Sequence, residues 1–211
     1  MEPQRRSIPK SAGERLMTTI VDDVSQSDPQ RCFMSIPRSS DRNDGLRDGS
    51  YALIARAVNR CAWWMEDLLG KGAGFPTIAT YLNPMDFRHV TLIFGAIKAG
   101  YKMFYSSPRN RLKVQVALLE KLECDILMTP EQMSDTTRGV LNSRAMRKFI
   151  LPDLVFFFED EPVQPYPYTK TWEEAREDPY VVMHSSGTTG TKNPDPEARH
   201  SCCPRRLPTF H

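Results

Sequence analysis

The sequence has no apolar run close to the roughly 20 residues that a membrane-spanning helix needs. Its first ten residues, Met1 to Lys10, are charged and contain proline, and they lack the apolar segment of a secretory signal. There is also no excess of charge of one sign, because 28 basic and 26 acidic side chains give a net charge of +2. A nearly neutral chain gives no reason to expect a nucleic-acid partner. These absences predict a cytoplasmic chain that binds neither membranes nor nucleic acids.

Cysteine is scarce and poorly spaced for metal binding or cross-linking. The sequence has five cysteines, an odd number, and Cys202 and Cys203 are adjacent. Adjacent cysteines suit neither the ligand spacing of a zinc site nor a disulfide framework. The other three, Cys32, Cys61 and Cys124, stand singly in otherwise regular segments, as reduced thiols do. We therefore expect free thiols and no metal site.

What the sequence does contain is an alternation of strand and helix patterns. Its 211 residues, 40% of them hydrophobic, suffice for one core or for one domain with tails. The first 50 residues are largely polar, with an amphipathic patch at 16–24 and an expected loop over 35–50. Periodicity and flanking glycines predict helices over 51–70, 86–100 and 107–122, partial helix over 130–148 and a helical turn at 171–176. Strands are expected over 75–82, 101–105, 125–129, 151–158 and 180–183. This order is typical of an α/β fold with a mostly parallel sheet and helices outside it.

One segment carries a clear chemical signal. Directly after the last expected strand, residues 185–192 read SSGTTGTK. Small residues allow the backbone to approach a ligand closely, consecutive N–H groups form an anion-binding hollow, and the hydroxyl groups add donors. Lys192 would supply a point charge for a phosphate. Two residues separate the glycines, and Asn193 follows the lysine, so the segment is not a Walker A motif.

The same composition also fits a plain surface turn. The position of the segment favours ligand binding, because ligands of open α/β sheets bind beyond the carboxyl ends of the strands. The segment begins where an expected strand ends.

Several segments of the chain resemble one family. HSSGTTGTK at 184–192 is similar to the phosphate-binding signature of the adenylate-forming (AMP-binding) superfamily. FMSIPRS at 33–39, AVNRCAWWMEDLLG at 57–70 and DFRHVTLIFGAIKAGYKMFYSSPRN at 86–110 resemble the N-terminal part of adenylation domains in fungal NRPS-like and carboxylate-reductase multidomain enzymes. The resemblance runs from about residue 15 to residue 190.

The resemblance implies a fold and a chemistry. The fold would be the N-terminal part of the large subdomain of an adenylate-forming enzyme, an incomplete α/β unit with a mostly parallel sheet flanked by helices. Such ATP-dependent ligases and reductases bind ATP or AMP with Mg²⁺, activate a small carboxylic acid as an acyl-adenylate, and load it on the phosphopantetheine of a carrier protein in secondary metabolism. By position, nucleotide binding falls on His184, Ser185, Ser186, Gly187, Thr188, Thr189, Gly190 and Lys192. No catalytic residue is carried over.

Two of these positions have a second interpretation. The family has Pro-Lys where this chain has Thr191-Lys192, so the register of the lysine differs from the family pattern. His184 would contact nucleotide or substrate, but a histidine at a strand end also commonly bonds to the backbone.

The last 20 residues break the pattern. Residues 192–211 contain four prolines and show no periodicity. Read one base forward, the degenerate code for residues 197–208 permits Arg-His-Gly-Thr-Leu-Ala-Ala-His-Asp-Ala-Phe-Gln, which resembles the helix that follows the loop in the family. We therefore expect a disordered segment at 1–14, a partial AMP-binding domain at 15–191 and an unstructured, frameshifted or misspliced tail at 192–211. An in-frame, correctly spliced transcript across residues 191–193 would contradict the shift.

The segments that the family places after the loop are missing from these 211 residues. They include an adenine-stacking aromatic residue, a ribose-binding acid and a C-terminal catalytic lysine. We therefore expect an adenylation-domain fragment that is inactive alone. Two alternatives stay open: a non-catalytic remnant that binds a nucleotide or a protein, and a split enzyme completed in trans.

Overall fold

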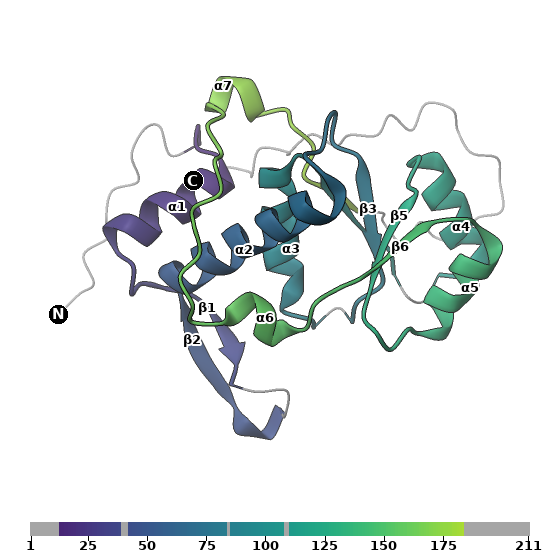
Figure 1. Ribbon diagram of the computed structural model, residues 1–211, viewed down its shortest axis with the longest axis horizontal. Coiled ribbons are helices and arrows are strands. Elements are labelled where there is room, and N and C mark those ends of the chain that lie inside the picture. Colours follow the sequence, from purple (N-terminus) through teal and green to yellow (C-terminus); the bar gives the residue numbers. More distant parts are fainter. Residues whose placement is uncertain (1–12, 39–41, 84, 108–109, 184–211) are drawn as a thin grey trace, which may run out of the picture.

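The computed structural model describes residues 13–38, 42–83, 85–107 and 110–183, and it has the predicted α/β architecture (Figure 1). A five-stranded sheet runs in the order β6-β5-β3-β4-β7, and every neighbouring pair is parallel. Its strands are β3 (Thr77–Thr80), β4 (Lys102–Tyr105), β5 (Ile126–Thr129), β6 (Arg147–Ile150) and β7 (Val181–Met183). A separate antiparallel hairpin joins β1 (Cys32–Pro37) to β2 (Leu46–Ser50).

Helices cover both faces of the parallel sheet. The helices are α1 (Met17–Ser27), α2 (Tyr51–Leu69), α3 (Arg88–Ala99), α4 (Leu112–Lys121), α5 (Asp135–Ser143), α6 (Leu154–Phe158) and α7 (Trp172–Ala175), with a 3₁₀ turn at Arg42–Asp44. None of the helices in the described ranges has the length and apolarity that crossing a membrane requires.

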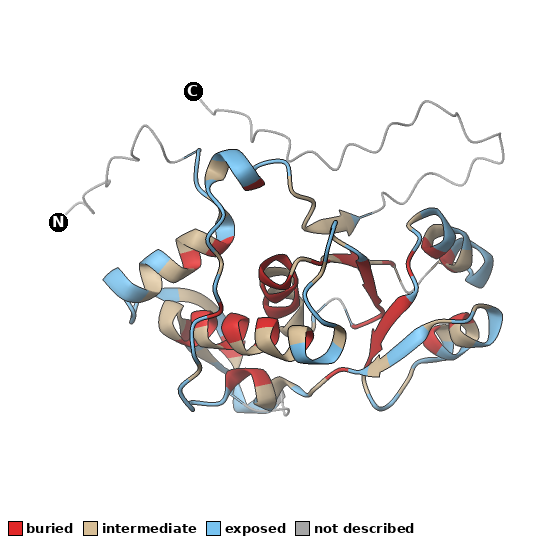
Figure 2. Ribbon diagram, turned by 45° about the horizontal axis from the view of Figure 1, so that its top comes forward, coloured by how far each residue is buried: buried red, intermediate tan, exposed pale blue. Residues whose placement is uncertain are grey.

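Alternation along the strands creates two cores. Successive side chains of a strand point to opposite faces of the sheet. Ile78 and Met103 therefore pack with α2 and α3 in one cluster, while Ala79 and Phe104 pack with α4 and α5 in the other. Because all residues of β3 and β5 are buried, these strands read as short apolar runs, and Figure 2 shows the burial concentrated there.

The expected strand at 151–158 is wrong. This segment forms α6, and the strand of this region is β6, which lies just before it in a stretch expected to be partly helical. Three consecutive phenylalanines favour a strand by propensity. However, the carboxylate of Asp153 accepts a hydrogen bond from the backbone N–H of Phe156 at 3.0 Å and caps a helical turn. That turn buries Phe157, whose ring lies edge-on to Trp64 at 6.1 Å between centroids.

The expected loop at 35–50 is also wrong, because both of its ends belong to the β1–β2 hairpin. Only Ile36 on β1 and Gly49 on β2 are buried, so the alternation that marks a strand is too weak to read. Two predicted helix starts shift as well: α3 begins at Arg88 and α4 at Leu112. The glycines expected to end helices do so, since α2 stops before Gly70 and α3 before Gly100, which has a φ of 85°.

A glycine sets the distance between α2 and α3. A Cβ atom on Gly95 would lie 2.6 Å from Sγ and 2.8 Å from Cβ of the buried Cys61. Real Cβ atoms do not approach other heavy atoms so closely, so α3 can pack against α2 at this separation only with glycine at 95.

A buried lysine joins three helices. The ammonium group of Lys98 on α3 donates to both carboxylate oxygens of Asp22 on α1, at 2.8 and 2.7 Å, and to Oδ1 of Asn59 on α2 at 2.8 Å. These three acceptors use all three of its donors. Burial lowers the pKa of Lys98, and Asp22 opposes that effect. The same Oδ1 of Asn59 accepts from the backbone N–H of Tyr166 at 3.2 Å.

A strap over residues 159–170 crosses α2 and leads to α7 (Figure 1). Arg60 donates to the backbone carbonyls of Phe157, Glu159 and Glu161, at 3.0, 3.2 and 3.0 Å. One turn further along α2, the indole N–H of Trp63 donates to the carbonyl of Gln164 at 3.0 Å. Because residues three to four positions apart share one face of a helix, these side chains fix the course of the strap.

Replacing Gly95 with alanine should lower the free energy of unfolding by about 1–3 kcal/mol, because the new methyl group overlaps Cys61. Gly139, in α5, is the matched control, since a Cβ there would meet Leu112 at 3.4 Å, an ordinary contact. Gly139→Ala should therefore stabilise the chain by up to about 1 kcal/mol. Urea unfolding followed by circular dichroism measures both changes. Effects of the same sign at the two positions would contradict the packing described for Gly95.

Replacing Lys98 with methionine should cost about 2–3 kcal/mol of unfolding free energy, because Asp22 and Asn59 lose a shared donor. This loss of unfolding free energy is at the low end of the range expected for breaking a buried ion pair, because the Asp22 side chain is 30% exposed and remains partly hydrated. Lys170→Met is the control, since the ion pair of Lys170 with Asp178 lies near the surface and should be worth less than about 1 kcal/mol. Equal losses in the two variants, measured by urea unfolding, would show that the buried lysine has no special role.

Candidate functional site

The candidate site lies at the carboxyl edge of the parallel sheet, where β7 ends. Tyr105, the last residue of β4, is paired with Met183, the last residue of β7. The chain therefore leaves β7 beside the turn that follows β4. The predicted nucleotide-binding residues His184, Ser185, Ser186, Gly187, Thr188, Thr189, Gly190 and Lys192 lie outside the described residues.

A buried glutamine holds the turn that follows β4. Gln115 on α4 is fully buried. Its Oε1 accepts a hydrogen bond from the hydroxyl of Ser106, and its Nε2 donates to the carbonyl of Ser107 at 2.8 Å. The amide of Asn110 also donates to Oγ of Ser106, at 3.3 Å. The two residues after β4 are thus fixed from α4, next to the strand that leads into the predicted loop.

Sequence reasoning missed Gln115. It lies four residues before Leu119, on the side of α4 that is buried, whereas Leu112 on the expected apolar face is 42% exposed. A single polar residue on the buried face of a helix is the signal that could have identified it, because buried amides need partners.

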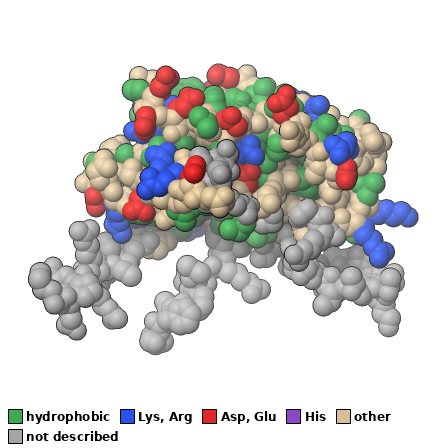
Figure 3. All heavy atoms as spheres, turned by 90° about the horizontal axis from the view of Figure 1, so that it is seen from below, with side chains coloured by type: hydrophobic (Ala, Val, Ile, Leu, Met, Phe, Trp, Pro, Cys, Tyr) green, Lys and Arg blue, Asp and Glu red, His purple; other side chains and the backbone are tan. Residues whose placement is uncertain are grey.

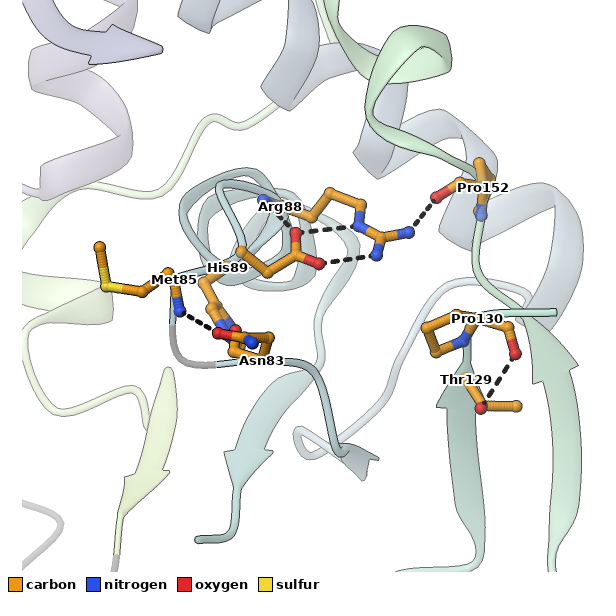
Figure 4. A network of polar contacts seen from close by, with 8 residues as sticks. Asn83, Met85, Arg88, His89, Thr129, Pro130 and Pro152 are labelled. Atoms are coloured by element: carbon orange, nitrogen blue, oxygen red, sulfur yellow. Dashed lines mark hydrogen bonds and ion pairs between the residues drawn. The ribbon is translucent and has the colours of Figure 1, made fainter. Parts of the chain in front are cut away.

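The segment after β3 forms a polar network at the same edge of the sheet (Figure 4). His89 bonds through Nε2 to the carbonyl of Asn83 at 2.9 Å, and because a carbonyl only accepts, Nε2 carries the proton. The hydroxyl of Tyr105 donates to the carbonyl of His89 at 3.2 Å, and the two rings meet edge-on. Figure 4 also shows Thr129 at the carboxyl end of β5, where its hydroxyl donates to the carbonyl of Pro130. Polar groups thus lie at or just after the carboxyl ends of three neighbouring strands, β3, β4 and β5.

Asp86 and Arg88 form a closed ion pair within this network. Arg88 donates from Nε and Nη2 to the two carboxylate oxygens of Asp86, at 2.9 and 2.7 Å, and from Nη1 to the carbonyl of Pro152 at 2.8 Å. Burial by itself would raise the pKa of Asp86, but hydrogen bonds and the charge of Arg88 outweigh it and lower the pKa. All three nitrogens of the guanidinium are engaged in these contacts, so this pair ties the loop to the segment before α6 and is not a free phosphate ligand.

A groove of about 540 Å³ opens beside the ion pair, between the hairpin and the start of α6. Leu46 and Met85 on its wall are 57% and 70% exposed. Acidic and basic side chains are interspersed on the face shown in Figure 3, as expected from the net charge of +2.

The described residues contain no group of three or more histidine, cysteine, aspartate or glutamate side chains that could hold a metal ion. Cys32, Cys61 and Cys124 are free thiols. Burial raises the pKa of Cys124 to about 11, and that of Cys61 is raised still further, so neither is a reactive thiolate near neutral pH.

Two proteins of known sequence that resemble this chain share more than 30% identity with it. A carboxylic acid reductase from Neurospora crassa is 37% identical over 185 residues, which is 86% of this chain and 17% of the relative. The isocyanide synthase-NRPS hybrid crmA from Aspergillus fumigatus is 33% identical over 186 residues, 87% of this chain and 12% of the relative. The chain thus spans less than a fifth of the length of either protein. No protein-family model matches it.

Solved structures share the fold at low sequence identity. The N-terminal domain of FACL13 from Mycobacterium tuberculosis superposes with a TM-score of 0.59 at 16% identity, covering 82% of this chain and 42% of that one. The fatty acyl-adenylate ligase from L. pneumophila, solved with acyl adenylate and pyrophosphate, superposes with a TM-score of 0.57 at 11% identity, covering 87% of this chain and 30% of that one. By sequence and by fold, the chain belongs to the adenylate-forming family and corresponds to the N-terminal part of an adenylation domain like those of fungal carboxylic acid reductases and NRPS-like enzymes.

Proposed function

We propose that residues 184–192 bind the phosphates of ATP and that the chain serves the activation of a small carboxylic acid as an acyl-adenylate. One observation carries the proposal: Met183 is paired with Tyr105, so the Ser/Thr/Gly segment begins at the carboxyl edge of a parallel sheet. Ligands of such sheets bind at this edge. The two relatives, named as a carboxylic acid reductase and an NRPS hybrid, support the same chemistry. Loading on the phosphopantetheine of a carrier protein would follow.

Each part of the segment has a role in this proposal. The glycines Gly187 and Gly190 let the backbone approach the phosphates, whose negative charge the consecutive N–H groups stabilise. The hydroxyls of Ser185, Ser186, Thr188 and Thr189 add donors, while Lys192 adds a positive charge. His184, at the end of β7, would contact the nucleotide or the acid.

The described wall of the site suits a phosphate-rich neighbour. Ser106, Ser107 and Asn110 bring hydroxyl and amide groups to the turn beside β7, and Gln115 fixes that turn. Mg²⁺, when bound, would neutralise phosphate charge. Because no acidic cluster is found among the described residues, we expect the ion to arrive with the nucleotide rather than in a separate protein site.

The proposal also covers the organisation of the chain. We assign residues 15–191 to a partial adenylation domain that works in the cytoplasm. Of the flanking segments expected at 1–14 and 192–211, all but residues 13 and 14 lie outside the described residues. The 211 residues on their own should not catalyse, because acyl-adenylate formation needs positioning and charge stabilisation together. In the structural relatives, the matching part covers only 42% and 30% of the chain.

Purified chain should bind ATP weakly, with a dissociation constant on the order of 1 mM, and should not bind adenosine, because its contacts are to phosphate. Gln115→Met should weaken ATP binding several-fold by releasing the turn at Ser106 and Ser107. Thr91→Val, a buried position on α3 outside this turn, is the matched control. Isothermal titration measures the affinities.

Three outcomes would contradict the proposal, two of them for the phosphate site and one for the expected inactivity of the chain. Equal binding of ATP and adenosine, or no binding of either, would show that the chain makes no phosphate contacts and would favour a protein-binding remnant. Acid-dependent exchange of pyrophosphate into ATP by the 211-residue chain would show that it is active alone.

A further inference from the structure

A second cavity lies at the amino edge of the sheet, away from the proposed phosphate site. It has a volume of about 200 Å³ and is lined by the start of α1, by Ile97 near the end of α3, by α7 and by Tyr180. Tyr180 immediately precedes β7, whereas the predicted phosphate loop follows it. The strand has three residues, so the two sites are separated by about 10 Å of strand.

The body of this cavity fits one ring. Side chains of Leu16, Ile97, Tyr168, Trp172 and Tyr180 give it a largely apolar and aromatic lining. A dry apolar cavity of about 150 Å³ is large enough to hold benzene. The cavity therefore has room for a single aromatic ring with a short substituent.

One end of the cavity is polar. Helix α1 has 11 residues, its N-cap residue Leu16 provides no side-chain cap, and its first turn has no acidic residue, so its free backbone N–H groups can donate to an anion. Thr18, in that turn, lines the cavity and is 1% exposed, and its Oγ1 has no hydrogen-bond partner. A buried hydroxyl without a partner is costly unless a ligand supplies one.

The phenol of Tyr168 also lines the cavity. Burial raises the pKa of Tyr168, and the nearby hydroxyl of Thr18 opposes that rise. The two groups are thus neighbours, although Oγ1 of Thr18 does not reach hydrogen-bond geometry. A bound acceptor could take a hydrogen bond from either hydroxyl.

Charge around the cavity is positive on balance. Asp178 is paired with Lys170 at 2.5 Å, so its charge is compensated. Arg176 has only a loose contact with Glu177 at 3.9 Å, and it lines the cavity from α7. Arg15, beside the start of α1, is paired with Asp23 at 2.6 Å. An anionic group in this cavity therefore meets the N–H groups of the first turn of α1, and Arg176 adds positive charge to the same lining.

We propose that this cavity binds a small single-ring carboxylate, with the ring between α7 and Tyr180 and the carboxylate at the first turn of α1, against Thr18. The site is distinct from the proposed phosphate site, since the two lie at opposite edges of the sheet.

Titration of the full 211-residue chain with benzoate tests the proposal, using calorimetry or the change in tryptophan fluorescence, since Trp172 lines the cavity and Trp63 and Trp64 do not. Benzoate should bind with a dissociation constant on the order of 1 mM or lower, and benzyl alcohol, a neutral molecule of similar size, should bind at least several-fold more weakly. Thr18→Val should weaken benzoate binding by about 3–10-fold, the effect of one lost hydrogen bond. Ala175→Leu should weaken it by more than tenfold, because Ala175 lines the cavity and the larger side chain fills it.

Thr91→Val is the matched control, since Thr91 is also buried with a hydroxyl that has no partner, but it lies outside the cavity. It should bind benzoate like the parent chain, and saturating ATP should leave the affinity unchanged. Thermal unfolding shows whether Ala175→Leu still folds, and Thr18→Val provides a test that does not depend on it. The proposal is overturned if benzoate does not bind, if benzyl alcohol binds equally well, or if Thr18→Val binds benzoate like the parent chain.

Discussion

The contacts of Lys98 are the constraint on which the described fold most depends. One ammonium group, buried in α3, joins α1 through Asp22 and α2 through Asn59, and Asn59 in turn holds the backbone of the strap at Tyr166. The strap leads to α7 and then to β7, so this cluster contributes to the position of the strand that precedes the proposed phosphate-binding segment. The start of α1, which lines the amino-edge cavity, depends on it as well. A charge that is expensive to bury thus links α1, α2 and α3 and, through Asn59, the strap.

Sequence patterns predicted the parts of the fold that repeat one physical signal. Helix α2 is long and amphipathic, the strands β3, β4 and β5 have buried centres, and Gly70 and Gly100 mark helix ends by their conformational freedom. The errors come from segments whose structure depends on distant partners. Phe156–Phe158 form a helix because Asp153 caps it and α2 receives it, and the hairpin strands bury too few residues to show alternation.

The site was predictable only in part. The position of the loop after β7 followed from the order of strands and helices, but the role of Gln115 did not, because its partners lie at the end of another element, β4. The same holds for Arg88, whose partners are Asp86 nearby and Pro152 far along the chain. Composition and periodicity describe one element at a time, whereas these contacts arise where elements meet.

The contacts between the strap and α2 constrain the sequence of α2 more strongly than the sequence of the strap. Arg60 and Trp63 bind it through backbone carbonyls, which every residue type offers. Most side chains of residues 159–164 could therefore change during evolution without loss of these contacts, whereas Arg60 and Trp63 could not. In distant relatives, we accordingly expect the sequence of the strap to diverge while its course over the helix is retained. The side chains that hold this segment in place therefore belong to α2, about 100 residues earlier in the chain.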